Sequence, residues 1–210
     1  MRLRYAERDA RRIHAILTGV GGVKGEDARL LLATGASAFR RALAELGARA
    51  AAAKERGERT VLLVYYSGHA KDGALRLGAG RLPLDELRAE LERSPADVRI
   101  GLLDSCRSGA IVRAKGVRPA PAFDVASDAG GGPSGLVLIA SSAADEDSQE
   151  SDAVGASWFT HHLASGLLGG ADTATLSLGV DEPVATEWIE QTLRAALLLR
   201  QPSPRVLSNQ

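Results

Sequence analysis

Three short, largely apolar runs of aliphatic and β-branched residues give the chain its main pattern. They are Val61–Tyr66, Val98–Leu103 and Leu136–Ala140. Short apolar runs of this kind are typical of strands that are buried on both faces of a sheet. A helical pattern lies between the first two runs. A strand, a helix and a strand in this order are typical of a parallel crossover unit, and we therefore expect an α/β fold with a mostly parallel sheet.

The other elements are predicted from helical spacing and from turn residues. Apolar residues recur at helical spacing over Tyr5–Leu17, which predicts an amphipathic first helix that ends near Gly19. Ala28–Ala33 is predicted to be a short strand. Further helices are expected at residues 36–56, 83–94, 158–168 and 184–199, and a hairpin is expected to pair residues 74–77 with residues 81–82.

The length of the chain favours one domain with a small C-terminal appendage. A chain of 210 residues can bury a substantial core. Residues 116–134 are rich in proline and glycine, and we interpret them as a linker inside the domain rather than a boundary. The domain is assigned to residues 1–172. Residues 173–210 are expected to hold a helix and a disordered tail, which are either part of the same domain or unassigned.

Composition excludes several classes of partner and site. The 26 basic residues balance the 26 acidic ones, so no overall field would attract nucleic acid or an anionic membrane. The single cysteine excludes an internal disulfide framework and a multi-cysteine zinc site. No apolar run approaches the roughly 20 residues that span a bilayer, and the basic start at residues 1–4 lacks a signal-peptide core. We expect a cytoplasmic protein without nucleic-acid or membrane partners, and its oligomeric state stays open.

Two of the predicted strands end in polar motifs that carry chemistry. Ser67–His69 follows the first strand, and Asp104–Cys106 follows the second. Because buried parallel strands bring their carboxyl ends to one edge of a sheet, an imidazole and a thiol 37 positions apart in sequence would meet there. The imidazole of His69 can deprotonate the thiol of Cys106 and later protonate the leaving amine. This geometry predicts a thiol protease.

The same two motifs also supply backbone donors. The negative oxygen that develops during acyl transfer needs fixed N–H groups close to it. The N–H groups of Gly68, Ala70 and Cys106 are the candidates, because small residues around both motifs let a substrate backbone come close.

These residues resemble a known family. Tyr65–His69 and Asp104–Gly109, each after an aliphatic strand, are similar to the two signature strands of the caspase-like cysteine peptidases, specifically their bacterial metacaspase-type branch. Supporting fragments are found at residues 5–10, 140–143 and 158–160, and the similarity covers about residues 5 to 170. The resemblance implies a three-layer α/β/α sandwich and a catalytic dyad of His69 and Cys106.

The resemblance also implies a substrate pocket for a basic side chain. It places Asp104 at the pocket floor, where a carboxylate favours guanidinium or ammonium and repels an acidic side chain. We therefore expect protein or peptide substrates that are cleaved after Arg or Lys. Ser67 and Ser141 are expected to line the same pocket. Self-cleavage sites are expected in the linker, at Arg113, Lys115 and Arg118.

The chain departs from the family pattern in its early region. Ala70 stands where the family has glycine directly after the histidine. The family also has an interior strand before the first helix and draws a second acidic pocket residue from that region. That strand is apparently missing from this chain, so Ala28–Ala33 would lack a neighbour.

Other interpretations of the same residues stay open. The chain could be a catalytically inactive caspase-like module that binds a partner, or an unrelated α/β domain with His69, Asp104 and Cys106 as metal ligands. A lone cysteine is often only a small buried hydrophobe, and an aspartate often caps a turn. No cofactor is required by the dyad. The acidic run Asp145–Asp152 lacks the fixed spacing of an EF-hand, but calcium remains a candidate activator because metacaspase-type enzymes often depend on it.

Overall fold

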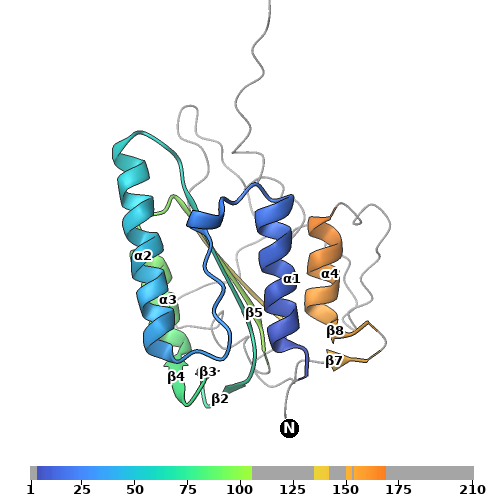
Figure 1. Cartoon of the computed structure of the whole chain (residues 1–210). Helices are drawn as coiled ribbons and strands as arrows, with labels where there is room; N and C mark the ends of the chain where they lie inside the picture. The colour runs from blue at the N-terminus through green and yellow to red at the C-terminus, as the bar shows by residue number, and fades with distance from the viewer. Residues whose placement is uncertain (1–3, 106–134, 142–149, 153, 169–210) are drawn as a thin grey trace, which may run out of the picture.

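A parallel three-stranded sheet forms the centre of the molecule. The computed structural model describes residues 4–105, 135–141, 150–152 and 154–168 (Figure 1). Within these residues β1 (Val61–Ser67), β5 (Val98–Asp104) and β6 (Gly135–Ala140) lie in the order β1-β5-β6, and both pairs are parallel. The predicted parallel sheet is confirmed, and so is each of the three predicted strands.

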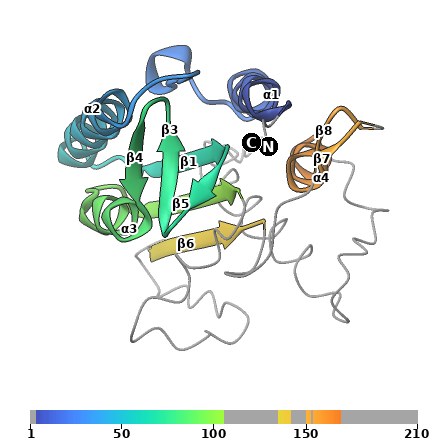
Figure 2. The same ribbon diagram turned by 90° about the horizontal axis from the view of Figure 1, so that it is seen from below.

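Helices cover both faces of this sheet. Figure 2 shows α2 (Ala36–Glu55) and α3 (Leu84–Arg93) on one side of the strands, and α1 (Ala6–Gly19) and α4 (Trp158–Leu167) on the other. The four helices confirm the sequence prediction, and most of their ends lie within two residues of the predicted ends. The predicted helix at 184–199 and the predicted linker at 116–134 lie outside the described residues. The fold is the predicted α/β/α sandwich.

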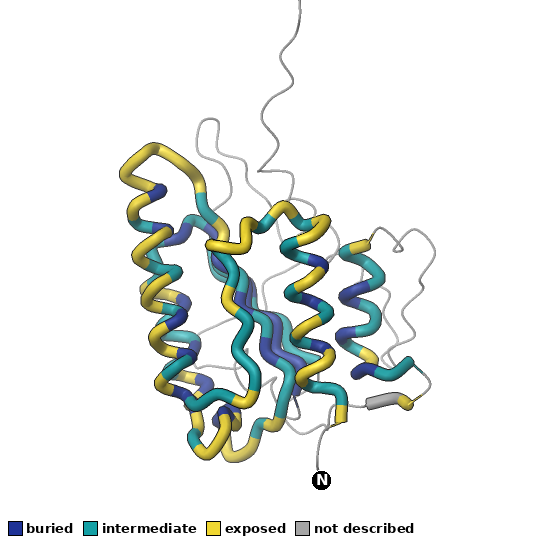
Figure 3. Tube along the Cα trace, viewed as in Figure 1, coloured by how far each residue is buried: buried dark blue, intermediate teal, exposed yellow. Residues whose placement is uncertain are grey.

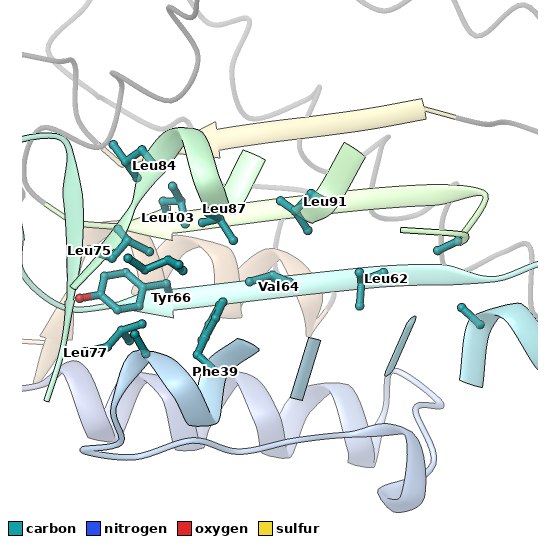
Figure 4. Close-up of a cluster of buried hydrophobic side chains, with 14 residues drawn as sticks. Phe39, Leu62, Val64, Tyr66, Leu75, Leu77, Leu84, Leu87, Leu91 and Leu103 are labelled. Carbon is teal, nitrogen blue, oxygen red and sulfur yellow. The ribbon is translucent and has the colours of Figure 1, made fainter. Parts of the chain in front are cut away.

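The alternating side chains of β1 explain the two apolar layers. Leu62, Val64 and Tyr66 point to the face covered by α2 and α3, where they pack with Phe39 and Leu87 (Figure 4). On the opposite face the side chains of β5 pack against α1 and α4; the buried members of this second cluster are Ile13, Ile16, Val98, Ile100, Leu102, Leu163 and Ala164. Figure 3 shows buried positions along the sheet and exposed positions on the outer sides of the helices. Both layers exclude water from the sheet, which stabilises it.

A small antiparallel sheet follows directly after β1. It consists of β2 (Ala70–Lys71), β3 (Ala74–Leu77) and β4 (Gly80–Pro83). Asp72 and Gly73 both have positive φ, of 53° and 68°, which is the conformation of a two-residue hairpin turn of type I′. The pairing of β3 with β4 confirms the predicted hairpin, whereas β2 was not predicted. Two further short strands, β7 (Glu150–Ser151) and β8 (Ala156–Ser157), pair before α4.

The predicted strand at Ala28–Ala33 is wrong. These residues form no strand. A 3-10 helix at Gly25–Asp27 precedes them. Ala33 has a positive φ of 50°, which ends the extended conformation. A strand needs a hydrogen-bonded neighbour, and none of the described strands, β1 included, pairs with Ala28–Ala33. A cavity of about 1810 Å³ lies between them, lined by α1, α2, residues 28–34 and β1.

Within the described residues, no strand pairs with the edge of β1 that faces this cavity. Thr60 accepts a hydrogen bond from Val98 N–H, and Gly68 N–H donates to Asp104, so the even-numbered residues of β1 direct their backbone groups to β5. In a parallel ladder the intervening residues direct theirs the other way. The backbone groups of Val61, Leu63 and Tyr65 therefore face the cavity.

No helix within the described part of the chain is long and apolar enough to cross a bilayer.

Candidate active site

The two polar motifs lie at the same edge of the sheet. β1 and β5 run in register from Val61 opposite Val98 to Ser67 opposite Asp104. The Gly68 N–H donates to the Asp104 carbonyl at 3.1 Å, which extends the ladder one residue beyond β1. His69 follows Ser67 by two residues, as Cys106 follows Asp104. The predicted side-by-side placement of the two strand ends is therefore found, while Cys106 itself lies outside the described residues.

The backbone of His69 is held firmly while its side chain is exposed. The His69 carbonyl accepts a hydrogen bond from Arg76 N–H and another from the Tyr66 hydroxyl, both at 2.8 Å. Two donors on one carbonyl fix the orientation of the peptide group that follows His69. The imidazole is thus presented at the strand edge from a rigid backbone.

Asp104 is buried and accepts hydrogen bonds from the start of α4. Its side chain belongs to a residue that is only 3% exposed. Thr160 Oγ1 donates to Asp104 Oδ2 at 2.6 Å, and Ser157 Oγ donates to the same oxygen. Ser157 is also the N-cap of α4, since its Oγ accepts a hydrogen bond from Thr160 N–H at 2.9 Å. The end of β5 is therefore tied to the first turn of α4.

The hydrogen bonds around Asp104 continue to Tyr65 and to Asp9. The Tyr65 hydroxyl lies 2.5 Å from Thr160 Oγ1, and Ser157 N–H donates to Asp9 Oδ2 at 3.1 Å. Burial raises the pKa of Tyr65 well above its usual range, and the nearby charge of Asp104 raises it further. Five residues form one network beneath the strand edge, which we call the Asp9–Tyr65 network: Asp9, Ser157, Asp104, Thr160 and Tyr65.

Asp9 is the residue that the sequence analysis missed. It is 1% exposed and lies on the buried side of α1, together with Ile13 and Ile16. A carboxylate at helical spacing from two buried isoleucines is unusual, because charged groups are rarely buried without a role. That pattern was readable in the sequence. It gives the site a second carboxylate, one serine away from Asp104.

The other two predicted pocket residues also lie at this edge. Ser67 pairs with Asp104 across the ladder and is half-buried. Ser141 follows β6, its N–H donates to the Leu103 carbonyl at 2.9 Å, and its Oγ accepts from Ser105 N–H at 3.1 Å. Ser141 thus fixes the residue that directly precedes Cys106.

Of the two predicted donors next to the histidine, Gly68 and Ala70, only one remains available. The Gly68 N–H is taken up by the bond to Asp104 and serves the sheet. Ala70 is not among the residues with positive φ, so an alanine fits there without the strain that a left-handed conformation would bring.

Few of the remaining predicted site residues can be placed. Arg113, Lys115, Arg118 and most of the run Asp145–Asp152 lie outside the described residues. Asp152 accepts hydrogen bonds from the Tyr5 hydroxyl at 2.6 Å and from Arg4 Nη1 at 3.3 Å, and the pKa of Asp152 is lowered first by Tyr5 and then by Arg4. Across the part of the chain that the structure describes, no three His, Cys, Asp or Glu residues are grouped as a metal site.

Comparison with known proteins identifies the family. A family model described as the caspase domain matches residues 1–192. The match covers most of the chain, so the chain belongs to the caspase-domain family, as its two motifs predicted. This membership supports a cysteine-peptidase function in general terms. No curated protein and no solved structure matches the chain.

Proposed function

We propose that this chain is a cysteine-type endopeptidase, similar to the metacaspase-type branch, that cleaves peptide bonds after Arg or Lys. The observation that carries the proposal is the register of β1 and β5. Ser67 lies opposite Asp104, and the chain continues from these two residues to His69 and Cys106 respectively. Side chains that follow paired strand ends at equal distance are well placed to form a dyad.

The proposed reaction is acyl transfer through a thioester. His69 accepts the proton of the Cys106 thiol, and the sulfur attacks the substrate carbonyl carbon while the C=O π electrons move to oxygen. The Ala70 and Cys106 N–H groups stabilise that oxygen. When the intermediate collapses, the amine leaves with the proton from His69, and water then hydrolyses the thioester.

The specificity for a basic side chain rests on two carboxylates. Asp104 and Asp9 both bond to Ser157, so two negative groups lie around one buried serine. A guanidinium or ammonium group forms charge-assisted hydrogen bonds with carboxylates, whereas an acidic side chain would be repelled by both. The second carboxylate therefore supports the preference for Arg and Lys that Asp104 alone suggested.

Fluorogenic peptides that end in Arg, Lys or Asp test this proposal. We expect turnover of the Arg and Lys peptides, none of the Asp peptide, and loss of all turnover in Cys106→Ala. Parallel reactions with calcium and with a chelator examine calcium as an activator. Turnover abolished by chelator and retained in Cys106→Ala would instead indicate a metal-dependent hydrolase.

The second candidate is a caspase-like module without catalytic activity. It is favoured by the cavity beside β1, because this edge, with which no described strand pairs, can accept an extended segment of a partner. A folded protein that cleaves none of the three peptides, under either calcium condition, would support this candidate over the peptidase.

A further inference from the structure

We propose that Tyr66 is a positioning residue of this site, which holds the peptide group between His69 and Ala70 so that the Ala70 N–H points at the oxyanion of the reacting substrate. The inference rests on the proposed peptidase function. It assigns a catalytic consequence to a buried core tyrosine that does not touch the substrate.

The hydroxyl of Tyr66 lies between two backbone carbonyls. It is 2.8 Å from the His69 oxygen and 2.8 Å from the Arg76 oxygen, and Arg76 N–H donates to the same His69 oxygen at 2.8 Å. One phenol proton is therefore shared between the residue before β2 and a residue of β3. Burial raises the pKa of Tyr66 above its usual range, which favours the protonated hydroxyl at neutral pH.

Because the peptide bond is planar, the contact at the His69 carbonyl also orients the Ala70 N–H. In a trans peptide the C=O and the following N–H point in opposite directions. Because the His69 carbonyl is directed inward, at Tyr66 and Arg76, the Ala70 N–H is directed outward. Fixing the carbonyl therefore also fixes the donor.

The pairing of β2 with β3 leads to the same orientation. In an antiparallel pair, hydrogen-bonded and non-hydrogen-bonded residue pairs alternate along the ladder. Arg76 donates to His69, so the next pair, Ala70 opposite Leu75, is of the non-hydrogen-bonded kind. The Ala70 N–H consequently points away from β3.

Gly68 makes the close approach of the hydroxyl possible. A Cβ atom at position 68 would lie 2.4 Å from Tyr66 Oη and 2.7 Å from Cζ. The ring itself is locked, since Tyr66 is 7% exposed and packs in the cluster that contains Leu75 and Leu77 (Figure 4). The packed ring, the glycine and the two carbonyls together fix the orientation of the peptide group between His69 and Ala70.

The variant Tyr66→Phe tests the proposal because it keeps the ring and removes only the hydroxyl. An oxyanion donor acts on the transition state and not on the bound substrate. We therefore expect kcat for an Arg peptide to fall about tenfold, in line with the loss of one hydrogen bond, with KM nearly unchanged. The affinity for a peptide aldehyde with a terminal Arg, which forms a tetrahedral adduct, should fall by a similar factor.

Tyr65→Phe is the matched variant, because the two tyrosines are neighbours that point to opposite faces of β1. The Tyr65 hydroxyl bonds to Thr160, which donates to Asp104, so its loss should raise KM for Arg peptides more than it lowers kcat. A general effect of removing a buried hydroxyl would change both variants alike. Thermal unfolding of each variant records the loss of stability separately.

Two outcomes would overturn the proposal. One is a Tyr66→Phe enzyme whose kcat and aldehyde affinity equal those of the parent protein. The other is a fall in the alkylation rate of Cys106 by iodoacetamide that equals the fall in kcat, since that reaction reports the His–Cys pair and has no oxyanion. If the parent protein cleaves no peptide, the peptidase function fails. The fixed orientation of the peptide group between His69 and Ala70 is then tested by hydrogen exchange at the Ala70 and Arg76 amides. Unchanged protection of both amides in Tyr66→Phe would exclude a positioning role for Tyr66.

Discussion

Asp9 and Asp104 are joined through one residue: Ser157 donates its backbone N–H to Asp9 and its hydroxyl to Asp104. The first comes from α1 and the second from the end of β5, so a helix and a central strand meet at a buried serine. The arrangement connects the proposed specificity of the site with the packing of the sandwich. The predictions below separate these two contributions.

Removal of either carboxylate should weaken recognition of basic substrates. For Asp104→Asn we expect kcat/KM on an Arg peptide to fall about ten- to a hundredfold, mainly through KM, because a charge-assisted hydrogen bond is lost. Asp9→Asn should act in the same direction. Asp85→Asn, in the exposed first turn of α3, is the control and should leave the kinetics unchanged. An unaltered kcat/KM for the Arg peptide in both site variants would contradict the two-carboxylate pocket.

The contact of Gly68 with Tyr66 should make this glycine intolerant of a side chain. Gly68→Ala places a Cβ within 2.4 Å of the hydroxyl, and we expect a loss of about 1–3 kcal/mol of stability together with reduced kcat. Gly47→Ala is the comparison. Gly47 lies inside α2, and a Cβ atom there would meet only Pro95 Cδ, at 3.9 Å. That variant should gain about 0.5–1 kcal/mol from its helical position. Chemical denaturation of both variants measures the difference, and equal effects would refute the steric argument.

Thr160 should be important for stability as well as for the site. Its hydroxyl contacts Tyr65 and donates to Asp104, and the residue is fully buried. Thr160→Val leaves two buried polar groups with one partner fewer, and we expect a loss of about 1–3 kcal/mol in denaturant unfolding. Thr18→Val removes a hydroxyl that bonds only within α1 and should have a much smaller effect. A stable Thr160→Val protein would show that the network is not needed for folding.

The ion pair between α2 and α3 should make a small part of the stability depend on pH. Arg40 Nε and Nη2 donate to Glu86 at 2.5 and 3.0 Å, and the hydrogen bond from Arg40 lowers the pKa of Glu86. A lowered carboxyl pKa stabilises the folded state above the ordinary value, and this contribution is lost as the pH falls through the folded value.

Melting curves of the parent protein and of Glu86→Gln check this linkage. Their difference should be present at neutral pH and should disappear towards about pH 3, near and below the ordinary carboxyl pKa. Glu92→Gln is the control, since Glu92 pairs with Arg88 inside α3 only. Added salt should reduce the difference, because both partners are partly exposed to solvent. A difference that grows on acidification would have the wrong sign.

Self-processing is expected if the peptidase is active. Arg113, Lys115 and Arg118 are basic and lie in a stretch near glycine and proline. Intact-mass spectrometry of the parent protein should reveal two fragments whose boundary follows one of these residues, and Cys106→Ala should remain whole. Identical intact masses for the two proteins would exclude self-cleavage.

Local patterns in the sequence were sufficient for most of the fold. The runs that became β1, β5 and β6 carry their burial in their own composition, and the hairpin of β3 and β4 is coded by its turn residues. Ala28–Ala33 has similar apolar content, but a strand exists only when a neighbour accepts its hydrogen bonds, and no local pattern reports that neighbour.

The candidate site was likewise predictable only where local patterns in the sequence indicate its residues. Positions at the ends of apolar runs indicated His69 and Asp104, because a parallel sheet gathers such positions at one edge. The contact of Asp9 with Ser157 joins residues 148 positions apart, and only packing of α1 against α4 brings them together. The role proposed for Tyr66 depends on the His69 carbonyl and on the pairing of β2 with β3, which the sequence did not predict.

The two carboxylates that bond to Ser157 make the proposed pocket testable without any turnover, because a ligand that binds the folded chain stabilises it. A small guanidinium compound that occupies the proposed pocket binds the folded chain alone, so mass action should raise the melting temperature once its concentration exceeds the dissociation constant. Cys106→Ala should respond in the same way as the parent protein. Thermal shift therefore tests the charge preference of the proposed pocket independently of the thiol.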